Sequence, residues 1–411
     1  MAMTSVGIES MNLYAGPTYV DVRDLFTARG LDLERFDNLM MRKKSVALPC
    51  EDAVSYAVNA AKPIIDRLTP VERSRIGTVI TCTESPVDFA KSLSTYIHAL
   101  LGLDRNCRSL ELKQACYAGM GALQLAAGVV GSGFTPGEKV LVIATDTARA
   151  TARNTYAEPT QAAGAIAMLI GDRPRLLDLD PGAHGCCSYE IMDVHRPLPE
   201  LETGDPDMSL LSYLDCLENC FRAYAERVEG ADFQTTFDAL AFHTPFAGMV
   251  KGAHRRMMRR FGKAAPAEVE ADFIRRVAPS LHHCVEVGNI YAGTVFMALC
   301  GEITAGRRAG RIGLFSYGSG CSSEFLSGLV PEGAAAHLDA MAIDEGLARR
   351  LPIDVATYDR ILDLNDEWRF GIKDKEVDTG PYADLYDAFF AGRGLLRLKR
   401  VSTYHREYEW S

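Results

Sequence analysis

The sequence has no long apolar run and no surplus of positive charge. No stretch approaches the roughly 20 consecutive apolar residues that a membrane-spanning helix needs. Its 54 Asp and Glu residues outnumber its 44 Lys and Arg residues, for a formal charge of −10, whereas nucleic-acid-binding proteins show a basic patch or stripe. We therefore expect no membrane span and no nucleic-acid partner, although a local basic site for a phosphate is compatible with this charge.

The eleven cysteines include no C-x-x-C pair. Cys186 and Cys187 are adjacent, and Cys216 and Cys220 lie four residues apart in a helical pattern without neighbouring histidines. The N-terminal segment has no basic region followed by a long apolar stretch, so no secretory signal is evident. This pattern is typical of reduced, buried thiols in a cytoplasmic protein. We predict no metal site.

Apolar, β-branched runs alternate with helical patterns in both halves of the chain. The runs typical of buried strands are residues 76–82, 139–145, 239–242 and 311–316. The helical patterns are residues 89–101, 119–130, 210–228 and 249–261. This alternation predicts an α/β fold with largely parallel sheets. Because 411 residues exceed a typical single domain, the repeated order indicates two similar halves.

The remaining segments are expected on the outside of the molecule. Residues 197–207 and 262–269 are rich in Pro, Gly and acidic side chains, which favours surface loops. The part after about residue 331 is charged and aromatic, and we expect it to form outer helices and a final strand.

Cys116 follows a strand-like alternation and precedes a helical pattern, in the segment SLELKQACYA. A cysteine at such an elbow lies at a helix N-terminus, where the partial positive charge favours the thiolate. The small residues Ala115, Ala118 and Gly119 allow close approach of backbone and substrate, and backbone N–H groups there can stabilise an oxyanion. Taken alone, the pattern also fits a buried cysteine in tight helix–sheet packing.

Two ionisable side chains stand at the ends of predicted strands. Glu84 follows the first strand and precedes Pro86, at a strand end of the kind where α/β folds place active sites. His243 ends another strand, and Pro245 forces a turn directly after it. A neutral imidazole there can hydrogen-bond a thioester carbonyl or move protons. Either residue alone also fits a structural role.

Three further segments contain small residues and hydrogen-bond donors. Asn289, in VGNIYAG, can donate to a carbonyl oxygen. The turn Gly318-Ser319-Gly320, in FSYGSG, can present backbone N–H groups. The segment EPTQAAGA at residues 158–165 is composed mainly of small residues, which indicates close packing at a site wall or a dimer seam.

Together these segments resemble the 3-hydroxy-3-methylglutaryl-CoA synthase family. The motifs TES-VD--K, Cys-Tyr-Ala, EPTQ-AGA, FH-PF, GNIY-G and FSYGSG occur in the family's order across roughly residues 5–330. The resemblance implies the thiolase fold, with two α/β halves layered as αβαβα in a homodimer. The implied halves are residues 1–170, with Glu84 and Cys116, and residues 171–411, with His243 and Asn289.

The resemblance also implies roles for individual residues. Cys116 would take an acetyl group, Glu84 would act as general base and acid, and His243 would position the acceptor thioester. The implied substrate-binding residues are Pro245, Asn289, Tyr291, Gly318 and Ser319. No permanently bound cofactor is implied, because the substrates are phosphopantetheine thioesters carried by coenzyme A or by an acyl carrier protein.

One departure from the family favours the acyl carrier protein over coenzyme A. After FH-PF the family carries lysines that reach coenzyme A phosphates, but this chain has Gly248 and Gly252 at the corresponding positions. Loss of these cations weakens recognition of a free nucleotide thioester, which indicates the branch that uses donor and acceptor acyl carrier proteins in polyketide assembly. Lys251, Arg255 and Arg259 would share one helix face and could dock an acidic carrier protein.

Two other interpretations stay open at this point. The first is a synthase that joins acetyl-CoA to acetoacetyl-CoA in the mevalonate pathway. The second is a non-catalytic docking module that kept the fold, although the presence of Cys116, Glu84 and His243 argues against it.

Overall fold

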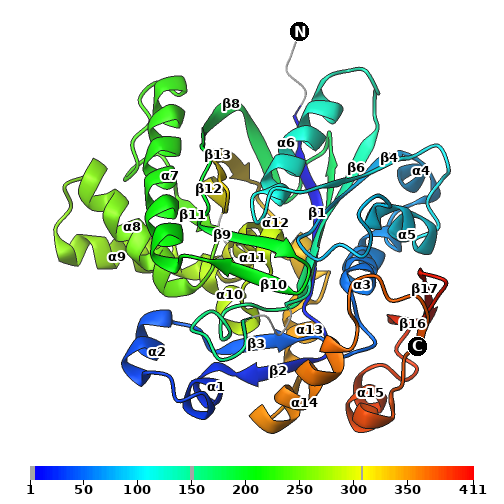
Figure 1. Cartoon of the computed structure of the whole chain (residues 1–411). Helices are drawn as coiled ribbons and strands as arrows, with labels where there is room; N and C mark the ends of the chain where they lie inside the picture. Colours follow the sequence, from blue (N-terminus) through cyan, green and yellow to red (C-terminus); the bar gives the residue numbers. More distant parts are fainter. Residues whose placement is uncertain (1–4, 149–151, 307–308) are drawn as a thin grey trace.

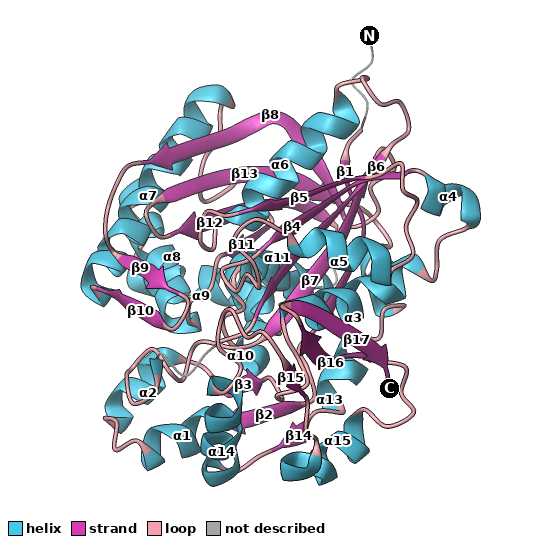
Figure 2. Ribbon diagram, turned by 45° about the vertical axis from the view of Figure 1, so that its right-hand side comes forward, coloured by secondary structure: helices cyan, strands magenta, loops and turns pink. Residues whose placement is uncertain are grey.

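A nine-stranded sheet runs through the centre of the molecule (Figures 1 and 2). The structure, a computed structural model, describes residues 5–148, 152–306 and 309–411. The spatial order of the strands is β11 (Ala239–Phe242), β12 (Gly310–Gly318), β13 (Ser322–Val330), β8 (Leu177–Ser188), β1 (Gly7–Tyr14), β7 (Gly164–Gly171), β6 (Lys139–Asp146), β4 (Ile76–Cys82) and β5 (Arg108–Leu112). Both β6 and β7 are buried along their whole length, which explains their continuous apolar sequences.

The sheet is mixed, so the expectation of largely parallel sheets was wrong. Among the described strands of this sheet, only the pairs β4–β5, β4–β6 and β11–β12 are parallel. The strands between them pair antiparallel, because β12 and β13 form a hairpin and β7 runs back beside both β6 and β1. The two halves of the sheet meet where β1 pairs with β8, over two residues only.

Helices cover both halves of the sheet and fill the space between them. On one side, α3 (Ala53–Ile65) packs on β1, β6 and β7, and α5 (Leu93–Leu100) packs on β4 and β5. On the other side, α7 (Pro206–Arg227) packs on β8, β12 and β13. Between them, α6 (Ala118–Gly131) contacts β4, β6 and β7, while α11 (Thr294–Gly301) contacts β11 and β12. This αβαβα arrangement confirms the predicted thiolase-type architecture.

The central layer is held together by close backbone contact. A Cβ atom on Gly119 of α6 would lie 2.4 Å from the carbonyl oxygen of Ala292, just before α11. No side chain fits there, so glycine is required for the approach of the two segments. This contact fixes the beginning of α6, and therefore the position of the preceding Cys116.

Smaller elements surround these layers. The helices are α1 (Val22–Ala28), α2 (Leu33–Leu39), α4 (Pro70–Ser74), α8 (Ala247–Phe261), α9 (Pro266–Arg276), α10 (Cys284–Val287), α12 (Ala334–Asp339), α13 (Ile343–Ala348), α14 (Val355–Asp366) and α15 (Ala383–Phe389). The strands are β2 (Thr18–Asp21), β3 (Lys43–Val46), β9 (Val194–Leu198), β10 (Leu201–Gly204), β14 (Leu351–Pro352), β15 (Lys375–Glu376), β16 (Leu396–Ser402) and β17 (His405–Trp410). The outer helices and final strands expected after residue 331 are thus present.

Both predicted surface loops contain regular structure. Most of residues 197–207 belongs to the β9–β10 hairpin, whose two-residue turn is Pro199-Glu200, and α7 begins at Pro206. The second predicted loop ends early because Pro266 occupies the first position of α9, a position that favours proline. Within the described residues, no helix combines the length and the apolar character needed to cross a bilayer.

Candidate active site

A cavity of about 460 Å³ brings together most of the predicted site residues. They follow the carboxyl ends of β4, β5, β11 and β12 or lie just before α11. The predicted residues that line it are Glu84, Cys116, His243, Pro245, Asn289, Tyr291 and Ser319. Gly318 instead lies behind Cys116, where a Cβ atom would come within 2.4 Å of the Tyr117 nitrogen. It allows the end of β12 to pack against the elbow.

Cys116 stands on a sharp turn between β5 and α6. Ala115 adopts a positive φ of 43°, and the backbone N–H of Tyr117 donates to the carbonyl of Gln114. Tyr117 is the N-cap of α6 and supplies no side-chain cap, so the first N–H groups of this helix face the turn without a competing side chain. The half-buried Cys116 side chain reaches the cavity from this turn.

The Cys116 thiol donates to Oε1 of Glu84 at 3.3 Å. Burial and the negative charge of Glu84 raise the pKa of Cys116 well above its ordinary value. The helix N-terminus therefore does not produce a resting thiolate, contrary to the sequence-based expectation. Burial also raises the pKa of Glu84, an effect that Arg196 opposes. The two groups hold one proton between them, ready to be lost when an electrophile reaches the sulfur.

Asp146, at the end of β6, organises the loop that carries Glu84. Its Oδ1 accepts hydrogen bonds from the Glu84 backbone N–H at 2.7 Å, the Ser85 hydroxyl at 3.0 Å and the Thr83 hydroxyl at 3.1 Å. Burial raises its pKa well above the ordinary value. The sequence-based reasoning missed this residue, although its position at a strand end beside Glu84 was a usable signal.

The β9–β10 hairpin braces the same loop from the other side. Arg196 Nη1 donates to the carbonyl of Glu84 at 2.7 Å, and Nη2 donates to Glu202 across the hairpin. Glu202 also accepts from Gln161, and the guanidinium lies 5.8 Å from the ring centroid of Tyr291. These residues line the cavity. The sequence placed Arg196 and Glu202 in or beside a surface loop and assigned them no role.

His243 is buried and neutral. Its backbone N–H donates to the carbonyl of Phe315 at 2.7 Å, and its own carbonyl accepts from the Tyr213 hydroxyl at 2.8 Å. The side chain is 2% exposed, and burial lowers its pKa to about 3. Its Nδ1 has no hydrogen-bond partner among the described residues. At neutral pH the imidazole can therefore donate or accept one hydrogen bond toward a ligand.

Asn289 presents its amide group to the cavity. Its side-chain Oδ1 accepts from the Tyr291 backbone N–H at 2.9 Å and from the Thr294 hydroxyl at 2.8 Å. Because the oxygen is occupied, the NH₂ group is the part available to a ligand carbonyl. The buried hydroxyl of Tyr291 is without a partner in the described structure. The small-residue segment at 158–165 forms part of the wall through Thr160 and Gln161.

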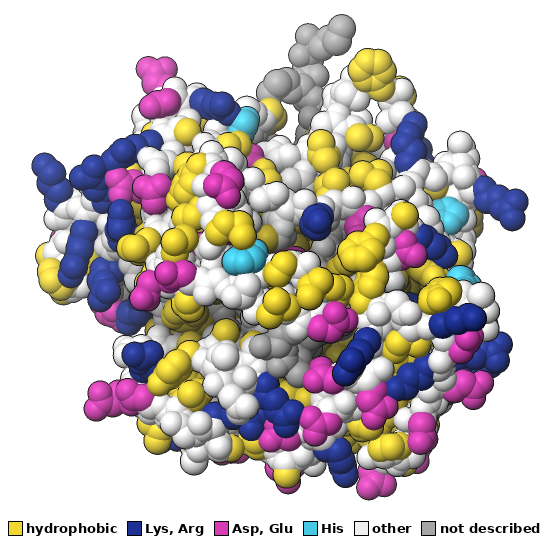
Figure 3. Space-filling view, viewed as in Figure 1, with side chains coloured by type: hydrophobic (Ala, Val, Ile, Leu, Met, Phe, Trp, Pro, Cys, Tyr) yellow, Lys and Arg dark blue, Asp and Glu magenta, His cyan; other side chains and the backbone are white. Residues whose placement is uncertain are grey.

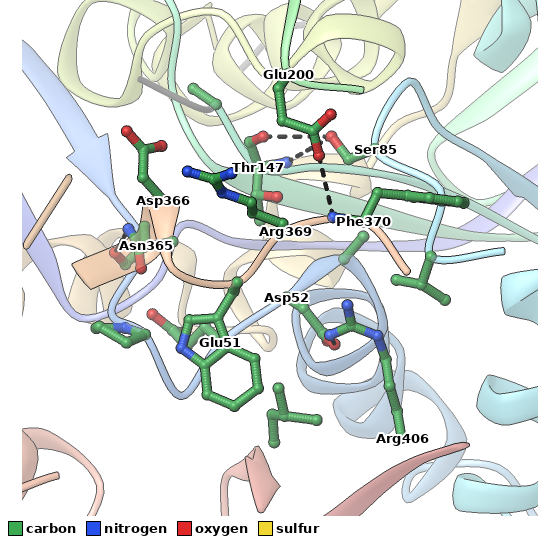
Figure 4. Close-up of a pocket in the computed structure, with 17 residues that line it drawn as sticks. Glu51, Asp52, Ser85, Thr147, Glu200, Asn365, Asp366, Arg369, Phe370 and Arg406 are labelled. Carbon is green, nitrogen blue, oxygen red and sulfur yellow. Dashed lines mark hydrogen bonds and ion pairs between the residues drawn. The ribbon is translucent and has the colours of Figure 1, made fainter. Parts of the chain in front are cut away.

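A second cavity, of about 610 Å³, lies on the other side of the Glu84–Ser85 loop. Figure 4 shows its polar lining, including Glu51, Asp52, Arg369 and Arg406, with Glu200 hydrogen-bonded to the backbone of Phe370. It contains neither Cys116 nor His243. The smaller cavity is therefore the one that combines a nucleophile, a carboxyl base, a neutral imidazole and an amide donor, a set suited to acyl transfer through a thioester.

Comparisons with known proteins agree with this chemistry. The family model for the hydroxymethylglutaryl-coenzyme A synthase N terminal region matches residues 3–174, and the C terminal model matches residues 259–377. The chain is 46% identical to the polyketide biosynthesis 3-hydroxy-3-methylglutaryl-ACP synthase PksG of Bacillus subtilis, over 99% of this chain and 100% of that protein. It is 33% identical to hydroxymethylglutaryl-CoA synthase of Enterococcus faecalis, over 86% and 91% of the two chains.

The structural comparisons point in the same direction. The curacin biosynthetic pathway HMG synthase in complex with acetyl donor-ACP superimposes with a TM-score of 0.96 at 50% identity, covering 99% of this chain and 100% of that one. MvaS in complex with 3-hydroxy-3-methylglutaryl coenzyme A gives a TM-score of 0.86 at 30% identity, covering 99% of both chains.

Proposed function

The chain belongs to the hydroxymethylglutaryl-CoA synthase family, and we propose that it acts on acyl carrier proteins in polyketide biosynthesis. It transfers an acetyl group to Cys116 and adds it to the β-keto carbon of an acetoacetyl or other β-ketoacyl chain on an acceptor carrier protein. The product carries a 3-hydroxy-3-methylglutaryl-type β-branch. The observation that carries this proposal is the full-length identity of 46% to an ACP synthase, against 33% to a CoA synthase.

The contact between Cys116 and Glu84 supports a first step of acetyl transfer. As the sulfur attacks the acetyl thioester, Glu84 accepts the thiol proton across the 3.3 Å contact. The phosphopantetheine thiolate leaves and takes this proton from Glu84, which returns Glu84 to the carboxylate. Burial raises the pKa of both groups, so the single proton stays within the pair until the substrate arrives, and Arg196 offsets the charge of the Glu84 carboxylate.

The same carboxylate serves the carbon–carbon bond. No decarboxylation supplies a carbanion, so Glu84 removes a proton from the acetyl methyl group on Cys116 to form an enolate. The enolate carbon attacks the β-keto carbon, and protonated Glu84 returns its proton to the new alkoxide. Water then cleaves the thioester bond to Cys116 and releases the product as a free carboxylate at that end.

His243 and Asn289 have the properties needed to hold the acceptor. The buried imidazole is neutral, and the Asn289 amide group is free to donate. Hydrogen bonds from these groups to carbonyl oxygens of the thioester are stronger in a cavity that excludes water than in bulk solvent. We assign Pro245, Tyr291 and Ser319 to the wall that shapes the acyl site, and Gly318 to support of the elbow.

A basic groove leads from the surface to the active-site cavity. It has a volume of about 1,100 Å³, includes Lys251, Arg255 and Arg259 of α8, and shares Asn38, Phe246 and Met249 with the cavity lining. Figure 3 shows Lys and Arg side chains gathered at the left edge, over α8 and α9. We propose that an acidic carrier protein docks here and passes its phosphopantetheine arm along the groove.

Some cations of this groove are already in ion pairs with acidic residues of the chain, and others are not. Lys251 pairs with Glu270, while Arg256 and Arg260 pair with Glu218. No ion pair of Arg255 or Arg259 occurs within the residues that the structure describes, and both are exposed. His254, which lies between Lys251 and Arg255 in the sequence, is fully buried against Asp272 and does not line the groove.

The two glycines of α8 have different structural explanations. A Cβ atom on Gly248 would lie 1.7 Å from the carbonyl oxygen of Asn38 in α2, so no lysine fits while α2 packs there. Gly252 has open space around it. Close packing of α2 thus removes one phosphate-pairing position, and the free space at Gly252 leaves room for a protein partner at the groove.

We further propose that the chain acts as a homodimer in the cytoplasm, with the boundary between its two halves at residues 170–171. Strand β5 stands at the edge of the large sheet, so one row of its backbone groups is available to a second copy. Nearby, Phe89 is 84% exposed and contacts Phe370 at a ring distance of 4.5 Å. An open sheet edge beside an exposed aromatic side chain is suited to a symmetric interface.

The direct test compares carriers for the same acyl groups. Acetyl and acetoacetyl groups are supplied either on acyl carrier proteins or on coenzyme A, and the products are weighed by mass spectrometry. We expect a lower KM for the carrier-bound acetyl donor and a mass gain on the acceptor carrier protein. Equal efficiency with both carriers would identify the chain as an ordinary CoA synthase.

A further inference from the structure

Three side chains of metal-ligating type converge outside the active-site cavity. His184 and Cys186 lie two residues apart in β8, so they project from the same face of that strand. Glu324 of β13 stands directly opposite Cys186 in the antiparallel register. This face points toward α6, because Tyr117 and Gln124 both donate hydrogen bonds to Glu324.

The separations between the ligand atoms match those of a tetrahedral zinc site. Cys186 Sγ lies 3.7 Å from His184 Nδ1, and this nitrogen lies 3.4 Å from Glu324 Oε1. All three atoms lie within 4.8 Å of one another. With Zn–S bonds of about 2.3 Å and Zn–N or Zn–O bonds of about 2.0–2.1 Å, tetrahedral geometry places neighbouring ligand atoms roughly 3.3–3.6 Å apart. Little movement is needed to close the site around an ion.

Neighbouring side chains hold the Glu324 carboxylate in place, and solvent can reach the Cys186 side chain. Glu324 is 1% exposed, and its carboxylate is oriented by Tyr117 at 2.9 Å and Gln124 at 2.6 Å, as the carboxylate ligands of metal sites usually are. Cys186 is exposed, and His184 also lines a neighbouring cavity of about 260 Å³. We propose that His184, Cys186 and Glu324 form a zinc-binding site whose fourth position is open to water.

Arg227 is the group that competes with the ion. Its Nη1 lies 2.8 Å from Nε2 and 3.0 Å from Nδ1 of His184. Ligation through Nδ1 leaves the proton on Nε2, which then no longer accepts from Arg227. Arg227 stands in the last turn of α7 and is exposed, so it can turn into solvent. Removing its charge should tighten zinc binding, by roughly fivefold for a partly screened neighbour.

Zinc binding at this site releases a proton. The ion replaces the thiol proton, forming a Zn–S bond and releasing H⁺ to solvent, so affinity should rise with pH between pH 6 and 8.

The experiment titrates the full chain with Co²⁺, followed by absorbance, and with Zn²⁺, followed by calorimetry. We expect one equivalent of metal and a thiolate-to-cobalt charge-transfer band. Cys186→Ser should abolish the band and weaken Zn²⁺ binding more than about tenfold, while Arg227→Ala should strengthen it. Cys187→Ser is the matched control, because the adjacent residue of β8 projects from the opposite face. Acetyl transfer to Cys116 should be unchanged in Cys186→Ser, which verifies its fold.

Three outcomes would overturn the site. His282, His283 and Asp344 form a second cluster of potential ligands. Metal that stays bound in Cys186→Ser but is lost in His282→Asn would belong to that cluster instead. A cobalt complex of the native chain without a thiolate band, or zinc binding weaker than millimolar, would equally contradict ligation by Cys186.

Discussion

The active-site thiol and carboxyl form a proton-sharing pair rather than a preformed ion pair. Cys116 donates to Glu84, and burial raises the pKa of each. The pair keeps its single proton in a cavity that must admit an apolar acyl chain, and Arg196 offsets the charge of the carboxylate. The thiol becomes reactive when the thioester carbonyl arrives. The properties of both residues therefore depend on their contact and cannot be assigned to either alone.

Cys116→Ser should abolish acetyl transfer while leaving the fold intact. The two side chains are nearly isosteric, but a serine hydroxyl beside Glu84 is a much weaker nucleophile than a thiol that can ionise. Mass spectrometry of the intact chain after incubation with the acetyl donor measures the adduct. Acetyl found on any cysteine other than Cys116 would contradict the assignment.

Glu84→Gln should separate the two chemical steps. Acetyl still accumulates on Cys116, more slowly, because the thiol proton can leave to solvent, whereas enolate formation lacks its base. We expect condensation to fall by about 10²–10⁴-fold. Single-turnover assays with pre-acetylated enzyme measure this step. Condensation at a near-native rate would show that another residue is the base.

His243 should make stability depend on pH. Its folded pKa of about 3 lies below the ordinary value of 6.5, so the unfolded chain binds a proton first as pH falls. The contribution of the neutral imidazole to the free energy of unfolding is fully present above about pH 6.5 and is lost as the pH falls toward 3. Between pH 7 and pH 5 the free energy of unfolding should fall by about 2 kcal/mol. Urea unfolding of His243→Gln should show a correspondingly smaller loss over this interval. An identical pH dependence in both proteins would rule out this linkage.

At the scale of elements, the β9–β10 hairpin positions the catalytic loop. Arg196 reaches from the hairpin to the Glu84 carbonyl, and Glu202 holds Arg196 in place. Asp146 fixes the same loop from β6. The carboxyl base is thus held between a strand end and a hairpin, and its side-chain position depends on both.

Arg196→Ala should lower kcat more than it raises KM. Removing the guanidinium frees the Glu84 loop and withdraws the charge that opposes the rise in the Glu84 pKa. The acidic limb of the pH profile of kcat/KM should therefore move to higher pH, with Arg196→Lys restoring part of the native profile. A changed KM with an unmoved acidic limb would indicate that Arg196 only binds substrate.

At the scale of the whole molecule, an acidic enzyme presents a basic groove to an acidic partner. The formal charge is −10, yet the groove beside the cavity mouth collects the arginines of α8. Because overall charge repels an acidic carrier protein, association must be guided by this local field and should weaken with added salt.

Charge reversal in the groove should affect only the protein substrate. Arg255→Glu and Arg259→Glu together should raise KM for the acetyl carrier protein by about tenfold, since each lost charge contact contributes roughly 0.2–1 kcal/mol, and leave acetyl-CoA kinetics unchanged. Lys399→Glu, an exposed position on β16, provides the control. Equal effects on both donors would place the substitutions at a substrate pocket instead of a docking surface.

Local sequence patterns predicted the strands β4, β5, β6, β11 and β12, the helices α5, α6, α7 and α8, and the principal residues of the cavity. Buried strands β4, β6 and β11 were recognisable because continuous apolar runs end at small or polar residues, and such ends carry Glu84, His243 and, unrecognised, Asp146. These signals are local, since a strand end and a following turn are encoded by a few neighbouring residues.

The contacts between distant segments become apparent in the three-dimensional structure alone. The local sequence does not reveal that Cys116 contacts Glu84. Burial and this contact raise the pKa of the thiol, whereas the helix N-terminus alone was expected to lower it. The local sequence also does not show that His254 is buried against Asp272, or that α2 packs on Gly248 so closely that no lysine fits there. Each of these contacts joins residues that are far apart in the sequence. Burial by such distant residues changes the pKa and the accessibility of a side chain more than its sequence neighbours do.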